Sequence, residues 1–233
     1  MIPLLILPQP TCTACDLHQY AKHPGVPGVF YSPSLTPSPS TPTLIILGMN
    51  PGYQEDRSNT PFVGPAGHLL KDVYLPPLLA HASIFLLNTA RCYSPSSAPP
   101  KTRHFRTCFP LFSAKDIATL ALPLLPSTPK ILLCVGSHAI STVTRFTQPK
   151  PWSLATAFSK QGTPTNLWGD WQLFSTFHPA AVLRTRNLLH PVADHIALVQ
   201  AALTGQMPVA SSPRIVSPFS PERKVKQHEP NQS

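Results

Sequence analysis

Residues 43–52 read TLIILGMNPG, and this stretch decides the fold of the 233-residue chain. Its apolar part, residues 44–47, does not alternate with polar residues, which is typical of a strand buried on both faces. It passes directly into a turn of small residues. Three further runs of the same kind follow at residues 84–87, 131–135 and, more mixed in composition, 171–176.

Helical patterns separate these runs, at residues 66–74, 113–122, 137–146 and 192–203. Apolar strands that alternate with helices favour a parallel sheet covered on both faces. The sequence therefore predicts an α/β fold, a three-layer αβα sandwich around a central, mainly parallel sheet of four strands. Ligands of such sheets bind beyond the carboxyl ends of the strands, so the residues after each run are candidates for a site.

The composition indicates a polyanionic partner. Lys and Arg number 18 against 9 Asp and Glu, which gives a formal net charge of +9. This excess fits either nucleic acid or an anionic membrane surface. No run approaches the roughly 18 apolar residues of a spanning helix. The apolar start, MIPLLIL, has no basic region, so we expect a soluble, cytoplasmic protein without a signal peptide.

Proline marks the domain organisation, since the chain contains 31 prolines. Residues 24–42 carry six of them among Gly, Ser and Thr, which predicts an extended connector. After Gln206 the sequence turns to Pro, Ser and charged residues without apolar periodicity. We therefore expect one domain at residues 1–205, with the connector inside it, and a disordered tail at residues 206–233.

Four of the five cysteines could form one metal site. Cys12 and Cys15 make a C-x2-C pair, and Cys92 and Cys108 follow later, whereas Cys134 lies in an apolar run and is expected to be a buried strand residue. Four thiolates suit zinc and an iron–sulfur cluster equally well. Unrelated free thiols are the alternative.

Polar and aromatic side chains stand where the predicted strands end. Asn50 follows the first run, Phe62 lies in a glycine-rich loop, Asn88 ends the second run, and His178 follows the fourth. Each has an ordinary structural explanation: a Pro-Gly turn, a core phenylalanine or a satisfied histidine. Because the carboxyl ends of parallel strands share one edge, we expect these side chains to face a common crevice.

The ordered motifs GMNPGYQED, PFVGPAG, LLNTARC and FHPAAVLR resemble the uracil-DNA glycosylase superfamily, and above all its family 4 type, which carries a 4Fe–4S cluster. The resemblance extends from about Cys12 to Leu203. It implies that Cys12, Cys15, Cys92 and Cys108 ligate the cluster, that the cluster has a structural role, and that it fixes Lys101, Arg103, His104 and Arg106 in a basic surface beside DNA.

Two positions depart from the family 4 pattern. Met49 stands where that type has Glu, so that GMNPG is similar instead to the G-I-N-P-G of mismatch-directed uracil and thymine glycosylases, whose Asn positions water. Pro65 stands where family 4 often has Arg. These departures leave the preferred base open.

The resemblance implies a role for each candidate residue. Asn50 would position the water, and His178 would donate a hydrogen bond to the departing base. Phe62 would stack on that base and Asn88 would read its edge. Gly48 and Met49 would help to bind the base, and Glu55 would form the pocket wall against a 5-methyl group. Leu183 would wedge into the base stack, and Arg184 would lie close to phosphate.

Three functions compete. The first is a monomeric, nucleoid-associated DNA glycosylase that flips and excises uracil or a related damaged or modified pyrimidine. The second is a catalytically weak, glycosylase-like module that binds DNA without cutting it; Met49 favours this alternative, and Asn50 and His178 oppose it. The third is a zinc-stabilised nucleotide-binding domain unrelated to repair.

Overall fold

The computed structural model describes residues 5–6, 12–32, 38–117, 128–165 and 171–206. Three predictions lie partly outside these residues: the end of the helix at 113–122, the middle of the connector at 24–42, and the tail beyond Gln206. Among the described residues, no helix combines the length and the apolar character needed to cross a membrane.

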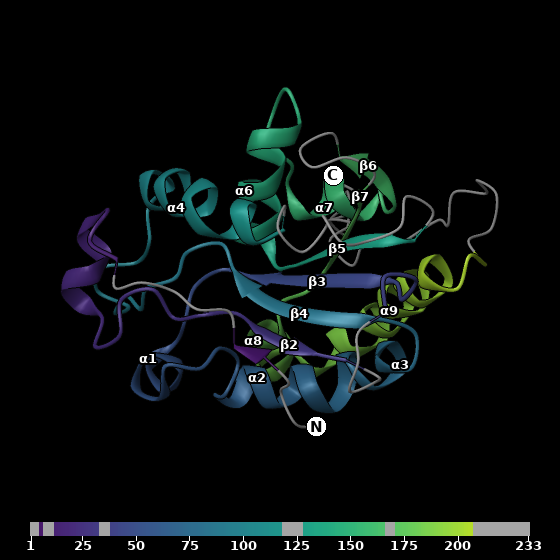
Figure 1. Ribbon diagram of the computed structural model, residues 1–233, viewed down its shortest axis with the longest axis horizontal. Coiled ribbons are helices and arrows are strands. Elements are labelled where there is room, and N and C mark those ends of the chain that lie inside the picture. The colour runs from purple at the N-terminus through teal and green to yellow at the C-terminus, as the bar shows by residue number, and fades with distance from the viewer. Residues whose placement is uncertain (1–4, 7–11, 33–37, 118–127, 166–170, 207–233) are drawn as a thin grey trace, which may run out of the picture.

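Within the described ranges, a mixed sheet of seven strands forms the middle layer (Figure 1). The four predicted strands are its parallel centre, in the order β4, β3, β5, β7. Their bounds are β3 Thr43–Gly48, β4 Ser83–Asn88, β5 Lys130–Val135 and β7 Trp171–Thr176. The prediction of four strands was nevertheless wrong in number, because three antiparallel strands extend the edges: β1 Leu5–Ile6, β2 Val29–Tyr31 and β6 Thr163–Thr165.

Strand β2 lies inside residues 24–42, which were predicted to be an extended connector without helix or central strand. Its three residues are buried and pair with β4. Phe30 lies opposite Phe85, with 4.4 Å between the ring centroids. The prolines on either side favour an extended chain, and pairing with β4 makes this segment a strand.

Helices cover both faces of the sheet. One face carries α2 Pro65–Leu69, which continues as η2 Leu70–Tyr74, together with α3 Pro76–Leu79, α8 Pro179–Arg184, η4 Arg186–Leu188 and α9 Leu189–Leu203. The other carries α6 Ser137–Thr147, α7 Leu154–Phe158 and α4 Thr102–Cys108, which continues as η3 Phe109–Ala114. Two short elements, η1 Asp16–Tyr20 and α1 Tyr53–Ser58, lie near the carboxyl ends of the strands.

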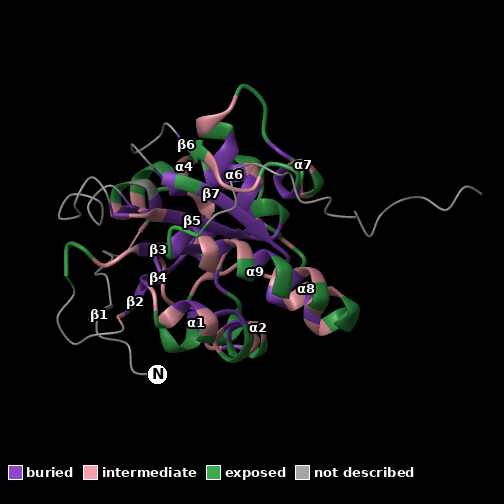
Figure 2. Ribbon diagram, turned by 90° about the vertical axis from the view of Figure 1, so that its right-hand side faces the viewer, coloured by how far each residue is buried: buried purple, intermediate pink, exposed green. Residues whose placement is uncertain are grey.

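Strand β3 shows how the two faces are filled. Leu44 and Ile46 pack into the core beneath α2, α3 and α9, whereas Ile45 and Leu47 pack into the core beneath α6 and α7. All four side chains are fully buried, as the unbroken apolar run predicted. Figure 2 shows the central strands buried and the helices exposed on their outer sides.

Candidate functional site

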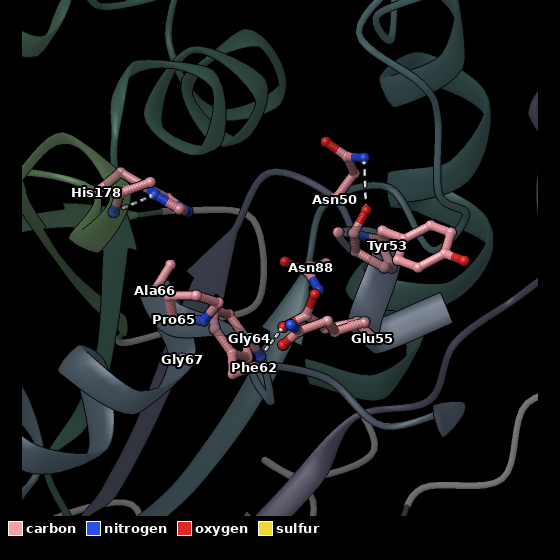
Figure 3. Close-up of a pocket in the computed structure, with 14 residues that line it drawn as sticks. Asn50, Tyr53, Glu55, Phe62, Gly64, Pro65, Ala66, Gly67, Asn88 and His178 are labelled. Carbon is pink, nitrogen blue, oxygen red and sulfur yellow. Dashed lines mark hydrogen bonds between the residues drawn. The ribbon is translucent and has the colours of Figure 1, made fainter. Parts of the chain in front are cut away.

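A pocket of about 420 Å³ opens at the carboxyl edge of the parallel strands. Segments that follow β3, β4 and β7, together with the loop into α2, line it (Figure 3). Five of the predicted site residues meet there: Asn50, Glu55, Phe62, Asn88 and His178. The structure also places Tyr53 in the lining, a residue that the sequence analysis did not single out.

Gly48, at the end of β3, is not among the described residues that line the pocket, but it lies directly behind two that do. Gly48 is the sheet neighbour of Asn88. A Cβ at Gly48 would lie 2.5 Å from Asn88 Oδ1 and 2.9 Å from Phe62 Cζ. Only glycine therefore lets the amide and the aromatic ring come together here.

The loop that presents Phe62 is held from two sides. Phe62 has a φ of 55°, and a Cβ at Gly67 would lie 2.0 Å from its carbonyl oxygen. Glu55 Oε1 accepts hydrogen bonds from the backbone N–H of Val63 at 2.8 Å and of Gly64 at 2.6 Å. Glu55 is among the residues that line the pocket, and its carboxylate also fixes the Phe62 loop.

The turn after β3 gives Asn50 and Met49 different surroundings. Asn50 Nδ2 donates to Pro51 O at 3.0 Å, which leaves the Oδ1 lone pairs for another donor. Met49 is not among the described residues that line the pocket; its side chain packs against a cluster around Cys92 and Cys108. The backbone between them is fixed, because Thr89 Oγ1 donates to Met49 O at 2.9 Å.

His178 lies across the pocket from Asn50 (Figure 3) and caps α8. Its Nδ1 accepts a hydrogen bond from Ala180 N at 3.1 Å. Burial lowers the pKa of His178 to about 4, with help from the charges of Arg184 and His138 and against the Glu55 carboxylate. The imidazole is therefore neutral at pH 7, and its proton is on Nε2.

Leu183 and Arg184 end helix α8 outside the pocket lining. Leu183 is half-buried and Arg184 is exposed. The charge of Arg184 acts on His178, so this helix end lies near the pocket.

Comparison with known proteins decides the family. The sequence model described as "Uracil DNA glycosylase superfamily" matches residues 36–203, which is most of the chain. The chain belongs to the uracil-DNA glycosylase superfamily.

Several curated relatives carry the name "Type-4 uracil-DNA glycosylase". The protein of Saccharolobus solfataricus is 27% identical over 197 residues, 84% of this chain and 83% of its own. Those of Sulfurisphaera tokodaii and Pyrobaculum aerophilum are each 27% identical and cover 76% and 74% of this chain, and 74% and 80% of their own. The resemblance read from the motifs is thus confirmed. Among solved structures, Pedobacter heparinus SMUG2 superposes with a TM-score of 0.38 at 11% identity, covering 71% of this chain and 76% of its own.

This superfamily member brings its cysteines toward one end of the sheet. Cys92 and Cys108 are buried with Leu17, Ala90 and Phe105, and Cys15 packs against them. Burial raises the pKa of Cys92 to about 11 and that of Cys108 to about 12, and Cys12 adds to both shifts. Among the described residues, however, no three Cys, His, Asp or Glu side chains form a group that could hold a metal ion.

Cys134 has different surroundings. It is fully buried in the core beneath α6 and α7, as predicted. Burial raises the pKa of its thiol as well.

Backbone N–H groups point at three of the thiols. Arg91 N lies 3.3 Å from Cys108 Sγ. The N–H groups of Leu17 and Gly25 lower the pKa of Cys15 and Cys92 respectively, against the larger effect of burial. Such donors stabilise thiolates and thiolate-bound clusters.

Two buried charged residues, which the sequence analysis did not assign, hold this region together. Asp56 accepts from the backbone N–H of Lys22 and His23, each at 2.9 Å. Arg91 is 1% exposed; its Nε donates to Asn88 O at 3.1 Å and its Nη2 pairs with Asp116 at 2.6 Å. The sequence offered one indication that these two residues matter, because both lie in motifs at the ends of strands: Asp56 in GMNPGYQED and Arg91 in LLNTARC.

The basic surface expected at residues 101–106 is only partly present. Arg103 pairs with Asp16 at 2.7 Å, and the buried His104 places Nε2 2.8 Å from the same carboxylate. Lys101 and Arg106 remain exposed. The local positive charge is therefore smaller than the sequence suggests.

Proposed function

We propose that this chain is a monomeric DNA glycosylase that hydrolyses the N-glycosidic bond of uracil, or of a related modified pyrimidine, after the base has left the duplex. Family membership supports glycosylase chemistry. The observation that carries the proposal is the pocket in which an aromatic ring, a base-reading amide, a neutral histidine and a second amide converge.

Base capture rests on Phe62 and Asn88. Extruding a base costs a few kcal/mol of stacking and pairing. Stacking on the Phe62 ring returns about 1–3 kcal/mol. Asn88 offers both an acceptor and a donor to the N3–H and O4 of uracil, and the missing side chain of Gly48 leaves room for its amide.

Bond cleavage builds positive charge on the sugar and negative charge on the leaving base. His178 Nε2–H is the donor to the base O2, because Nδ1 is occupied by Ala180 N–H. Water, held by Asn50 Oδ1, adds its oxygen to C1′ as the C1′–N1 bond breaks and the electron pair leaves with the base. Asn50 cannot take the proton, which passes to solvent; the reaction is therefore suited to bases that leave easily.

The end of α8 contacts the DNA in this proposal. Leu183 enters the space left by the extruded base, and Arg184 lies against a phosphate. Residues 1–205 form the glycosylase domain, which acts on DNA of the nucleoid, and residues 206–233 are an accessory tail.

A 4Fe–4S cluster bound by Cys12, Cys15, Cys92 and Cys108 completes the domain. The chemistry of the donors supports this proposal, since four thiols interact electrostatically and three receive backbone N–H groups, although the described residues do not draw them together into a metal-binding group. The raised pKa values of Cys15, Cys92 and Cys108 mean that binding releases protons. The cluster would supply cross-linking rather than chemistry: it would join the N-terminal segment to the segment after β4.

A panel of oligonucleotides, each with one modified pyrimidine in single or double strands, tests the proposal by scoring abasic sites. We expect the parent to excise uracil or a close analogue. His178→Ala should lower the single-turnover rate by about 10²–10³-fold, because it removes one donor to developing charge, with DNA affinity nearly unchanged. His190→Ala, at an exposed histidine of α9, is the matched control.

Two results would refute the proposal. Cleavage by both His178→Ala and Asn50→Ala at the parental rate would place the active site elsewhere. No cleavage of any panel member, combined with binding of an extruded base, would favour the binding-module alternative.

A further inference from the structure

A second pocket, of about 350 Å³, lies between α4 and α6. Lys101, Thr102 and Phe105 line one side, and His138, Ser141 and Arg145 line the other. Nothing in the proposed reaction uses these residues. Its volume is in the range of small-ligand sites.

The charges of this pocket are of one sign. Lys101 and Arg145 are exposed cations, His138 is exposed beside them, and no lining residue of the described chain is acidic. None of the ion pairs found within the described ranges includes Lys101 or Arg145, in contrast to Arg103 and its partner Asp16. Two cations that belong to none of these ion pairs therefore meet in this pocket.

The uncharged groups suit a phosphate. Thr102 and Ser141 bring hydroxyls, and Phe105 forms an apolar wall whose ring centroid lies 6.1 Å from that of His138. Guanidinium and ammonium groups beside hydroxyls form charge-assisted hydrogen bonds to phosphate oxygens.

The pocket adjoins the site of base excision. Helix α6 begins after Gly136, where a Cβ would lie 2.9 Å from His178 Cβ. The charge of His138 acts on His178. Arg145 stands seven residues beyond His138, about 10 Å along the helix. At about 3.4 Å of rise per nucleotide of one strand, this length spans about three nucleotides.

We propose that the pocket between α4 and α6 binds a DNA backbone phosphate one to three nucleotides from the extruded base. This inference rests on the proposed glycosylase function for its ligand. Arg145 and Lys101 share the phosphate charge, and the hydroxyls of Thr102 and Ser141 add hydrogen bonds.

Salt-dependent DNA binding by the full-length protein tests the proposal without requiring cleavage. Each neutralised phosphate contributes about 0.9 to the slope of log K against log salt. Arg145→Ala should lower the slope by about that amount, so that the variant loses about 3.5-fold less affinity than the parent between 50 and 200 mM salt. If both cations serve one phosphate, Lys101→Ala added to Arg145→Ala should change the slope little further, and Arg145→Lys should restore it.

Lys71→Ala is the control, because Lys71 lies in η2 on the opposite face of the sheet. It should keep the parental slope. A parental slope in Arg145→Ala and in the double variant would overturn the proposal.

Methylphosphonate substitution, which removes the charge of one phosphate at a time, distinguishes the source of the ligand. We expect one position near the target base to weaken the parent and leave Arg145→Ala unaffected. The proposal is wrong if no methylphosphonate position has this effect and if inorganic phosphate or a deoxynucleoside monophosphate binds the parent but not Arg145→Ala. In that case the pocket binds a free phosphate compound. If the protein cleaves no oligonucleotide of the panel but shows the expected salt slopes, the glycosylase function is refuted and the phosphate site proposed here stands.

Discussion

His195 should make the stability of the protein depend on pH in a calculable way. This side chain of α9 is 1% exposed, and its Nδ1 lies 3.2 Å from Thr176 Oγ1 at the end of β7. The ring of Phe158 packs on it, with 4.4 Å between centroids. Burial lowers the pKa of His195 from 6.5 to about 4, against a smaller opposing effect of Asp194.

The sign of this pH dependence follows from whether the folded or the unfolded state binds the proton at the higher pH. As pH falls, the unfolded chain protonates at its ordinary pKa while the folded chain stays neutral, so protons favour unfolding. The contribution of His195 is thus complete above pH 6.5 and is lost between pH 6.5 and about 4. Acidification from pH 7 to pH 5 should cost about 2 kcal/mol of unfolding free energy through this residue.

Urea unfolding at pH 7 and pH 5 measures this contribution. His195→Gln keeps a polar group opposite Thr176 and removes the titration, so its loss of stability between the two pH values should be about 2 kcal/mol smaller than in the parent. His190→Gln, at an exposed position of the same helix, should retain the parental loss. An equal loss in His195→Gln and the parent would show that the buried imidazole is not kept neutral by the fold.

Three further predictions concern the site. Asn50→Asp should keep or raise the single-turnover rate on uracil, because a carboxylate can accept the proton of water, while its charge weakens DNA binding; a rate as low as that of Asn50→Ala would contradict this. Cys108→Ser should lose iron and visible colour, and Cys134→Ser should keep both, as measured by iron analysis; stoichiometric zinc without iron in anaerobically purified protein would refute the cluster. Gly136→Ala should slow excision at least about 10-fold, because its φ is +90° and the new Cβ would lie 2.9 Å from His178 Cβ. A parental rate in that variant would show that Gly136 does not position the imidazole.

The buried strands and the pocket were accessible to sequence reasoning because both depend on local signals. Three unbroken apolar runs and one mixed run predicted the four central strands, and parallel pairing then required that residues after those strands share one edge. Asn50, Asn88 and His178 met there for that reason. Strand β2 was missed because three residues between prolines become a strand only by pairing with β4.

The sequence did not predict the direction of side chains in turns or the partners of buried charged residues. Met49 and Asn50 are adjacent, yet one packs against the cysteines and the other lines the pocket, a difference set by the hydrogen bonds of Thr89. From the sequence alone, Arg91 is indistinguishable from an exposed surface cation. Its burial depends on a carboxylate 25 residues away and on the carbonyl of Asn88.

The attachment of the N-terminal segment has a consequence for biosynthesis. Lys22 and His23 are held by Asp56, and Val26 N donates to Arg91 O, so every anchor of this segment is translated after it. Between Cys15 and Cys108 the ribosome adds 93 residues, which takes roughly 5–19 seconds at 5–20 residues per second. During that interval the first two cysteines have emerged without the partners that bury them. Nascent chains are therefore most open to thiol oxidation at this stage, and assembly of the proposed cluster has to wait for residue 108.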